Sequence, residues 1–184
     1  MSEHYVSRAG LKLAGAVEKF GLDFRGKVIL DVGSSTGGFT DYALQNGAAR
    51  VIAVDIGTNQ LHPSLREDNR IELHEKADIR TFQPTVKPDI VLIDVSFVSL
   101  REILPAVAKI CGPETPIIAL LKPQFEAKES ELNKGIVKND TVRRRIMADF
   151  EKWAKKGFLI NGKSDSHLPG SHGNKERFYL LKSL

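Results

Sequence analysis

Two short apolar runs, each opened by a proline, constrain the fold more than any other feature of the chain. They are PDIVLIDV at residues 88–95 and PIIALL at residues 116–121. A strand with one face in water alternates apolar and polar residues, whereas a run without alternation suits a strand buried on both faces. Such strands lie at the centre of parallel sheets that helices cover. The two runs therefore predict an α/β fold.

The rest of the chain alternates between strand-like and helix-like segments. The other predicted strands before residue 88 cover 27–32, 50–56 and 70–75, and the predicted helices cover 38–46, 99–110 and 140–156. Two final strands, 157–165 and 176–184, have no helix between them and should pair antiparallel. We therefore expect five β/α units followed by a hairpin. They would form one domain over residues 1–184, with a Rossmann-like, mostly parallel sheet of seven strands, the last antiparallel, and helices on both faces.

Composition narrows the class of protein. No apolar run approaches the ~20 residues that cross a bilayer, and the N-terminal MSEHYVSR lacks the apolar core of a signal peptide. The single Cys111 cannot form an internal disulfide and fits a reducing cytosol. The net charge of +4 permits a nucleic-acid partner without requiring one. We expect a cytoplasmic protein without a membrane partner, and the oligomeric state stays open.

The loop LDVGSSTGGFT at residues 30–40 lies between a predicted strand and a predicted helix, where open α/β sheets bind nucleotides. Its spacing places Ser35 where a dinucleotide fingerprint requires glycine. Asp31 would repel a pyrophosphate but attract an ammonium group, which favours S-adenosylmethionine over NAD(P). A tight turn that binds nothing is the alternative interpretation. The candidate cofactor-binding residues of this loop are Asp31, Gly33, Ser34, Ser35, Gly37 and Gly38.

Acidic residues follow the second and third predicted strands. Asp55 ends the second strand, where a ribose-binding acid is expected. Without the glycine loop, a solvated strand-end aspartate would be the better explanation. Asp78 follows the third strand and could reach an adenine edge, although a helix-capping or turn role suits it equally well.

The two central strands also end in charged residues. Asp94 ends the fourth strand and Lys122 ends the fifth. Carboxyl ends of central parallel strands face the same crevice, so these two side chains should be neighbours. From spacing alone, a structural ion pair that caps two strands is the simpler interpretation.

Five motifs together resemble one family along nearly the whole chain. YVSRAGLKL, DVGSSTGGFTD, DVSFVSL, LLKPQFE and LPGSHGNKERF look like the hemolysin-A (TlyA-type) ribosomal RNA 2′-O-methyltransferases, relatives of the FtsJ-like methyltransferases. The resemblance implies the seven-stranded methyltransferase fold, S-adenosylmethionine as cofactor, and ribosomal RNA cytidines or ribosomal subunits as substrate. Full-length members usually carry an N-terminal S4-like RNA-binding domain, so we expect this chain to correspond to the methyltransferase domain alone.

The same resemblance implies a Lys-Asp-Lys-Glu catalytic tetrad, filled here by Lys12, Asp94, Lys122 and Glu176. Methyl transfer to a ribose hydroxyl is an in-line displacement, so positioning can supply most of the catalysis. An ordinary lysine, with a pKa of about 10.4, is a poor base unless its surroundings depress that value. We expect Lys122 to orient and deprotonate the 2′-hydroxyl. Asp94 would orient Lys122 and also bind the cofactor, near the sulfonium of the methyl donor. Lys12 and Glu176 would hold the ribose.

Other residues near the predicted crevice are weaker candidates. Arg8 and Lys12 could contact RNA phosphates. Phe97 and Phe125 could stack on a flipped-out base, although packing in the core is the default for phenylalanine. The loop SHLPGSHGNK contains two histidines but no carboxylate pair, so no metal site is expected.

Three alternative functions remain. A non-catalytic RNA- or ribosome-binding module could retain the fold and the cofactor pocket, and a failure to bind S-adenosylmethionine would favour it. An NAD(P)-dependent oxidoreductase is disfavoured by Asp31 and by the missing glycine. The family name suggests a cytolysin, but the sequence contains no membrane-active segment that would support this function.

Overall fold

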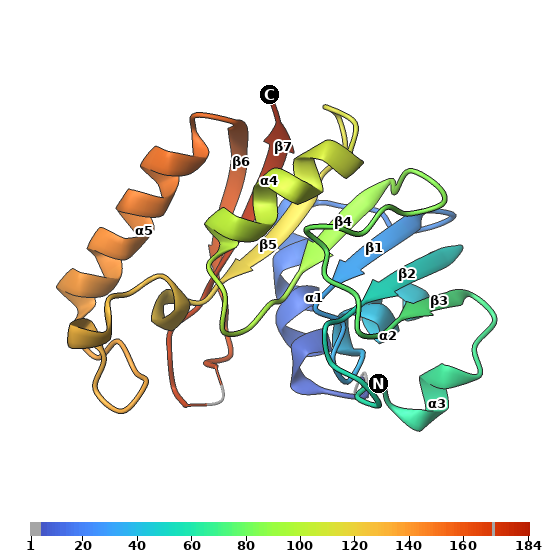
Figure 1. Cartoon of the computed structure of the whole chain (residues 1–184), viewed down its shortest axis with the longest axis horizontal. Coiled ribbons are helices and arrows are strands. Elements are labelled where there is room, and N and C mark those ends of the chain that lie inside the picture. The colour runs from blue at the N-terminus through green and yellow to red at the C-terminus, as the bar shows by residue number, and fades with distance from the viewer. Residues whose placement is uncertain (1–4, 171) are drawn as a thin grey trace.

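A computed structural model describes residues 5–170 and 172–184 of the chain. Its strands form a single seven-stranded sheet in the order β3-β2-β1-β4-β5-β7-β6 (Figure 1). Their bounds are β1 Val28–Val32, β2 Arg50–Val54, β3 Ile71–His74, β4 Ile90–Ile93, β5 Ile117–Leu121, β6 Phe158–Asp165 and β7 Arg177–Ser183. Strand β7 runs antiparallel to both of its neighbours, and the other adjacent pairs are parallel. The predicted sheet is therefore confirmed.

The helices only partly follow the prediction. They are α1 Arg8–Phe20, α2 Gly38–Gln45, α3 Pro63–Arg66, α4 Leu100–Ile110 and α5 Asp140–Ala154, with 3₁₀ turns η1 Pro123–Phe125 and η2 Glu129–Glu131. The three helices predicted from the sequence are confirmed to within about two residues, the usual uncertainty of a helix end. The expectation of five β/α units is wrong, because α3 has 4 residues and no helix connects β3 to β4. Strand β3 lies at the sheet edge, where less apolar surface needs a helical cover.

Side chains that alternate along each strand divide the core into two layers. In β1, Ile29 packs in the layer that contains α1 and α2, and Leu30 packs in the layer that contains α4 and α5. Figure 1 shows α4 and α5 in front of the sheet and α1 and α2 behind it. Helices cover both faces, as predicted. This explains why β4 and β5 contain no polar residue, since each of their side chains is buried.

Helix α1, which was not predicted, precedes the first strand and carries Lys12. Ser7 caps its N-terminus, since the Ser7 Oγ accepts a hydrogen bond from the Ala9 amide at 3.3 Å. Its C-terminus is Gly21, in the left-handed conformation that glycine favours. A Cβ on Gly38 would collide with Ser7 Oγ and lie 2.9 Å from Ala9 Cβ. Glycine at this position therefore lets α1 pack against the start of α2 and bring Lys12 towards the sheet.

Candidate active site

Lys122 and Asp94, which directly follow β5 and β4, form an ion pair. Their Nζ and Oδ1 atoms lie 2.7 Å apart. Asp94 Oδ1 makes no aligned hydrogen bond within the described part of the chain, and the Lys122 ammonium instead donates to Ser96 Oγ at 2.9 Å. The two side chains are 12% and 18% exposed, so the pair is largely desolvated but still reachable. The prediction that they are neighbours is confirmed.

Lys12 and Glu176 form a second ion pair, between α1 and the residue before β7. Lys12 Nζ donates to Glu176 Oε2 at 2.7 Å, and both side chains are buried. Gly170 makes room for this carboxylate, because a Cβ there would collide with Glu176 Oε1. All four tetrad positions are thus paired, two by two, at the carboxyl ends of the central strands.

Two cavities meet at the Lys122–Asp94 pair. The strand-end cavity has a volume of about 600 Å³, and its walls include Gly33, Ser35, Asp55, Asp78 and Asp94. The α1 cavity has a volume of about 720 Å³, and its walls include Arg8, Lys12, Lys122, Phe125 and Glu176. Ser96 and Phe97 line both cavities. Each volume suits a small-molecule or nucleoside ligand. Within the ion pair, Asp94 lines the strand-end cavity and Lys122 lines the α1 cavity.

The glycines of the loop after β1 serve packing as well as access. Gly33 has φ +81°, and a Cβ there would lie 2.8 Å from the backbone oxygen of Asp94. Gly33 therefore lets the loop cross directly beside the end of β4. Gly37 has φ +95°, and a Cβ there would meet the side chains of Leu61 and Leu65. Of the predicted glycines only Gly33 lines the strand-end cavity.

A third, smaller space lies under the same loop. This loop cavity has a volume of about 80 Å³, and Ser34, Ser35 and Gly38 are among its lining residues, together with Asp94. The Ser34 Oγ is buried and has no hydrogen-bond partner within the described residues. A buried hydroxyl without a partner carries a desolvation cost that a polar ligand would relieve.

Asp31 lies inside β1 and is fully buried. Its Oδ2 accepts a hydrogen bond from Thr40 Oγ1 at 2.6 Å, whereas its Oδ1 has no partner among residues 5–170 and 172–184. The pKa of Asp31 is raised to about 7, mainly by burial and to a smaller extent by the Asp94 charge, while the Thr40 hydrogen bond opposes the rise. Asp31 lines neither the strand-end cavity nor the loop cavity. The structure therefore places this carboxylate beneath the loop rather than on a cavity wall.

The other two predicted acids both face the strand-end cavity. Asp55 accepts hydrogen bonds from the backbone amides of Ser35 and Gly57, each at 2.7 Å, which fixes its orientation. Both of its oxygens retain lone pairs for further donors. Asp78 pairs with Arg80 at 2.6 Å, and the Arg80 hydrogen bond lowers the pKa of Asp78. Asp78 also forms a local turn, since its backbone oxygen accepts from the amides of residues 81 and 82.

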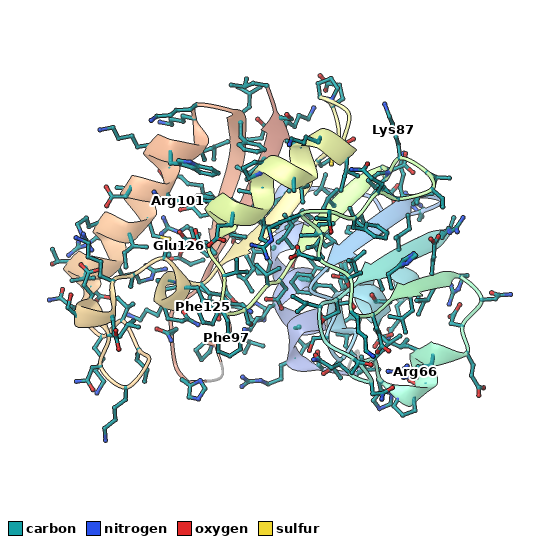
Figure 2. The ribbon with its side chains drawn as sticks, viewed as in Figure 1. Arg66, Lys87, Phe97, Arg101, Phe125 and Glu126 are labelled. Carbon is teal, nitrogen blue, oxygen red and sulfur yellow. The ribbon has the colours of Figure 1, made fainter. Side chains whose placement is uncertain are left out.

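Phe97 is an exposed aromatic residue at the boundary of the two large cavities. Its side chain is 92% exposed, so the default expectation of core packing is wrong for this residue. Its φ of +64° is unusual for a residue other than glycine. The Phe97 and Phe125 rings lie 5.2 Å apart, and Figure 2 shows them side by side. Arg8 is exposed on the wall of the α1 cavity.

Sequence reasoning missed several residues that hold the charged groups in place. Ser96, which binds Lys122, lies within the DVSF motif but had no assigned role. Thr40, which binds Asp31, closes the glycine loop. Only their closeness to a predicted acid could have indicated them. Within the described residues, no helix is long and apolar enough to cross a membrane. No three or more histidine, cysteine or acidic side chains of the described ranges gather as metal ligands would.

Comparison with known proteins places the chain in a family. The model of the FtsJ-like methyltransferase family matches residues 5–183. The chain is 43% identical to the 23S rRNA (cytidine-2′-O)-methyltransferase TlyA of Campylobacter jejuni, over 97% of this chain and 71% of that protein. Identity to the 16S/23S rRNA (cytidine-2′-O)-methyltransferase TlyA of Mycobacterium tuberculosis is 38%, over 97% and 69% of the two chains.

Comparison with solved structures also finds a close relative of this chain. A hemolysin-named protein from Lactococcus lactis superposes with a TM-score of 0.93 at 42% identity, over 97% of this chain and 88% of that chain. The chain spans 63% of the length of a further relative, YqxC of Bacillus subtilis, at 44% identity. The resemblance inferred from the five motifs is confirmed. The chain belongs to the FtsJ-like methyltransferase family.

Proposed function

We propose that this chain is an S-adenosylmethionine-dependent RNA 2′-O-methyltransferase that acts on cytidine ribose in ribosomal RNA. The observation that carries the proposal is the Lys122–Asp94 ion pair at the boundary of two nucleoside-sized cavities. Relatives that are named as rRNA (cytidine-2′-O)-methyltransferases support the choice of substrate. Ribosomal RNA or a ribosomal subunit is then the partner, and the cytoplasm the compartment.

The strand-end cavity is the proposed cofactor site. Asp55 would accept hydrogen bonds from the two ribose hydroxyls, and Asp78 would face the adenine. The methionine end would lie towards the loop cavity, near Ser34 and Asp31. The buried Ser34 Oγ, which has no hydrogen-bond partner among the described residues, supports this orientation, because an ammonium group supplies donors. Asp31, buried beneath the loop, would add a negative charge that attracts the ammonium without direct contact. When bound, S-adenosylmethionine supplies an electrophilic methyl group on a positively charged sulfur.

Lys122 is the proposed acceptor of the proton that the 2′-hydroxyl loses. Lys122 lies on the wall of the α1 cavity, while its partner Asp94 faces the strand-end cavity. In its neutral form the Lys122 amine takes the hydroxyl proton and becomes an ammonium that Asp94 stabilises at 2.7 Å. The hydrogen bond to Ser96 Oγ fixes the lysine side chain in this position. Asp94 also places a negative charge where the cofactor cavity begins, which favours a cation there.

The α1 cavity is the proposed site of the target nucleotide. Lys12 and Glu176, which form a rigid and buried ion pair, would hold the ribose in place. Arg8 would contact a phosphate at the mouth of the cavity. The exposed ring of Phe97, supported from the side by Phe125, offers a face on which the target base could stack.

Two measurements test the proposed function. In a calorimetric titration with S-adenosylmethionine, we expect one cofactor to bind per chain. In the second experiment, ribosomal subunits that lack the modification are incubated with the protein and methyl-labelled cofactor, and RNA is separated from protein. We expect the label in the RNA fraction. A chain that binds no cofactor, or label that remains with ribosomal protein, would refute the proposal.

A further inference from the structure

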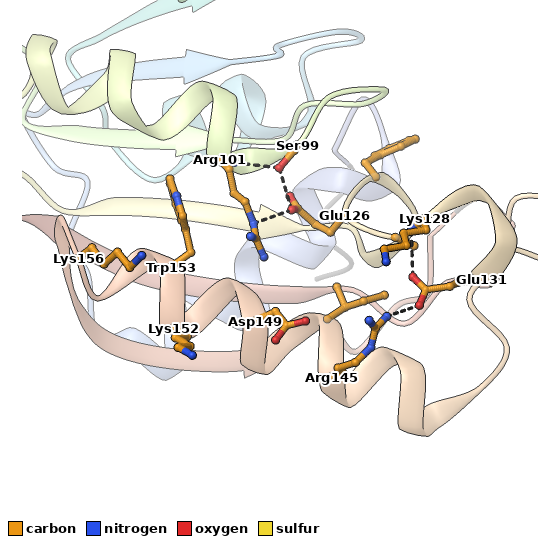
Figure 3. A pocket seen from close by; sticks show the side chains of 13 residues that line it. Ser99, Arg101, Glu126, Lys128, Glu131, Arg145, Asp149, Lys152, Trp153 and Lys156 are labelled. Atoms are coloured by element: carbon orange, nitrogen blue, oxygen red, sulfur yellow. Dashed lines mark hydrogen bonds and ion pairs between the residues drawn. The ribbon is translucent and has the colours of Figure 1, made fainter.

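The motif KPQFE begins with Lys122 and ends with Glu126, which has no role in the chemistry described so far. Glu126 directly follows η1, and its side chain is 3% exposed. Figure 2 labels it with Arg101 and the two phenylalanines, and Figure 3 shows its contacts from close by. A carboxylate so deeply buried needs partners that outweigh its lost hydration.

The partners of Glu126 lie at the start of α4, in the segment that follows Asp94. Its Oε2 accepts a hydrogen bond from Ser99 Oγ at 2.7 Å, and its Oε1 accepts one from the Leu100 amide at 2.8 Å. The Arg101 guanidinium lies 3.4 Å from Oε2 (Figure 3). Amides at a helix N-terminus lack partners within the helix, and the helix dipole favours an anion there. Glu126 therefore fastens the loop after β5 to the helix after β4.

Glu126 is the innermost of three links between these two loops. Lys122 contacts Asp94 and Ser96, the Phe125 ring packs beside the Phe97 ring, and Glu126 binds Ser99 and Leu100. The links occur in the same order along both segments, 122–126 and 94–100. Among the charged side chains of these links, the Glu126 carboxylate is the most buried, at 3% exposed against 12% for Lys122 and 18% for Asp94.

The loop between Asp94 and Ser99 needs such an anchor. Phe97 has a left-handed backbone, with φ +64°, although it is not a glycine. That conformation costs on the order of 1 kcal/mol and persists only where the surroundings hold it. The side chain of Phe97 is 92% exposed, so its own burial does not supply the restraint. The hydrogen bonds that Glu126 accepts from Ser99 and Leu100 hold the end of this loop.

We propose that Glu126 is a positioning residue, which holds the loop 94–99 so that Asp94 and Ser96 face Lys122 and Phe97 faces the α1 cavity. Its consequence for methyl transfer rests on the proposed function, but the restraint on the loop does not. A displacement of about 1 Å in a catalytic group can lower a rate by up to about 100-fold. Loss of Glu126 should therefore lower kcat far more than it weakens cofactor binding.

The test compares Glu126→Ala and Glu126→Gln with a matched control, Glu131→Gln. Glutamine can keep both hydrogen bonds, since its oxygen can accept from the Leu100 amide and its nitrogen can donate to Ser99 Oγ. Glu131 lines the same groove as Glu126, a space of about 500 Å³ beside α5, but pairs with Arg145 (Figure 3). It contacts neither segment 94–100 nor segment 122–126 through any interaction found among the described residues.

The first readout is steady-state methyl transfer, corrected for the folded fraction. We expect Glu126→Ala to lower kcat by roughly 10- to 100-fold with KM for S-adenosylmethionine within about threefold of wild type. Glu126→Gln should recover kcat to within about threefold, and Glu131→Gln should match wild type. A kcat of Glu126→Ala within about twofold of wild type would overturn the proposal. So would a loss that glutamine does not rescue. If Glu126→Ala does not fold, Ser99→Ala removes one of the two bonds, and an unchanged kcat there would also overturn it.

The second readout needs no enzymatic activity. Hydrogen exchange of the peptide 94–100 should speed up by about tenfold or more in Glu126→Ala, because the Leu100 amide loses its acceptor, and should not change in Glu131→Gln. Unchanged exchange would refute the restraint itself. If the wild-type protein transfers no methyl group while exchange responds as expected, then the proposed function has failed and the role of Glu126 in the loop stands.

Discussion

The two lysine–carboxylate pairs of the site have the same length and different surroundings. Both measure 2.7 Å, yet the Lys12–Glu176 side chains are 9% and 3% exposed, whereas those of Lys122 and Asp94 are 12% and 18% exposed. The buried pair is an aligned hydrogen bond. Asp94 Oδ1 has no aligned donor in the described residues, and the Lys122 ammonium is shared with Ser96.

This difference indicates separate tasks for chemically identical pairs. A fully desolvated and aligned pair is costly to break, because either partner alone leaves an uncompensated buried charge. The Lys122–Asp94 pair is less buried and lacks the aligned hydrogen bond, so breaking it should cost less stability than breaking the Lys12–Glu176 pair. We therefore propose that Lys12 and Glu176 form the frame of the ribose site and that Lys122, with Asp94, takes part in the proton transfer.

The largest expected effect is on the reaction, at the more exposed pair. Lys122→Ala should lower the single-turnover rate of methyl transfer by roughly 1000-fold, or about 4 kcal/mol of transition-state stabilisation. Cofactor affinity should stay near that of wild type, and Tm should fall less than when the more deeply buried Lys12–Glu176 pair is broken. Rapid-quench kinetics with saturating cofactor measure the rate. If the rate of the variant lies within about tenfold of the wild-type rate, Lys122 does not take part in the proton transfer.

The next effect is on stability, at the buried pair. Glu176→Ala should lower the free energy of unfolding by about 3 kcal/mol, because it leaves the Lys12 ammonium buried without a counter-charge. Urea denaturation followed by circular dichroism measures this change. The double variant Lys12→Met/Glu176→Gln should recover part of the loss. If both pairs prove equally unimportant for stability, the contrast between them is wrong.

Asp31 extends the comparison to the pH dependence of stability. It is a buried carboxylate that, unlike Asp94 and Glu176, forms no ion pair with a lysine among the described residues. Its pKa is about 7 in the folded chain, against the ordinary value of 3.8 that applies when the chain is unfolded. Between these values the unfolded chain releases the proton and the folded chain keeps it. The Asp31 contribution to the unfolding free energy therefore falls as pH rises through this window, by up to about 1.4 kcal/mol per pH unit.

Asp31→Asn should remove that slope from the cofactor-free protein. Urea titrations of wild type and variant between about pH 4 and pH 7 measure the difference. Bound S-adenosylmethionine should also flatten the wild-type slope, since a nearby ammonium favours the ionised carboxylate. Identical pH dependence in the two proteins would show that Asp31 is not held protonated by burial.

Phe97 should give the smallest effect. Phe97→Ala should raise KM for the RNA by about three- to tenfold, through the loss of stacking on one base, and leave Tm nearly unchanged. The control is Leu159→Ala, which removes another exposed apolar side chain, on β6 and away from both cavities. RNA titrations of initial rates measure KM. An equal change in both variants would show that exposure, not position, explains the result.

The sequence indicates the sheet well, because β4 and β5 are apolar on both faces and end in charged residues. Strand order in a parallel sheet then makes Asp94 and Lys122 neighbours without further information. Lys12 and Glu176 are different, since they are far apart in sequence and on different kinds of element. Only the resemblance to a family connects them, and the structure shows the connection as a 2.7 Å contact.

Other features depend on tertiary contacts that a pattern does not contain. Helix α1 was missed although its buried residues recur at helical spacing, because it precedes the first strand and no β/α alternation marks it. Burial of Asp31, exposure of Phe97 and the reach of Glu126 to α4 each depend on how two loops approach. A carboxylate that follows a phenylalanine in sequence gives no sign of the helix that it caps.

The most direct test of the central claim is the position of the transferred methyl group. RNA modified by the wild-type protein is hydrolysed in alkali, which cleaves only next to a free 2′-hydroxyl, and the resistant dinucleotides are identified by mass spectrometry. We predict a new alkali-resistant dinucleotide that begins with a methylated cytidine, absent from the untreated RNA and from RNA treated with Lys122→Ala. Methyl label found on a base, in RNA that alkali cleaves completely, would contradict the account.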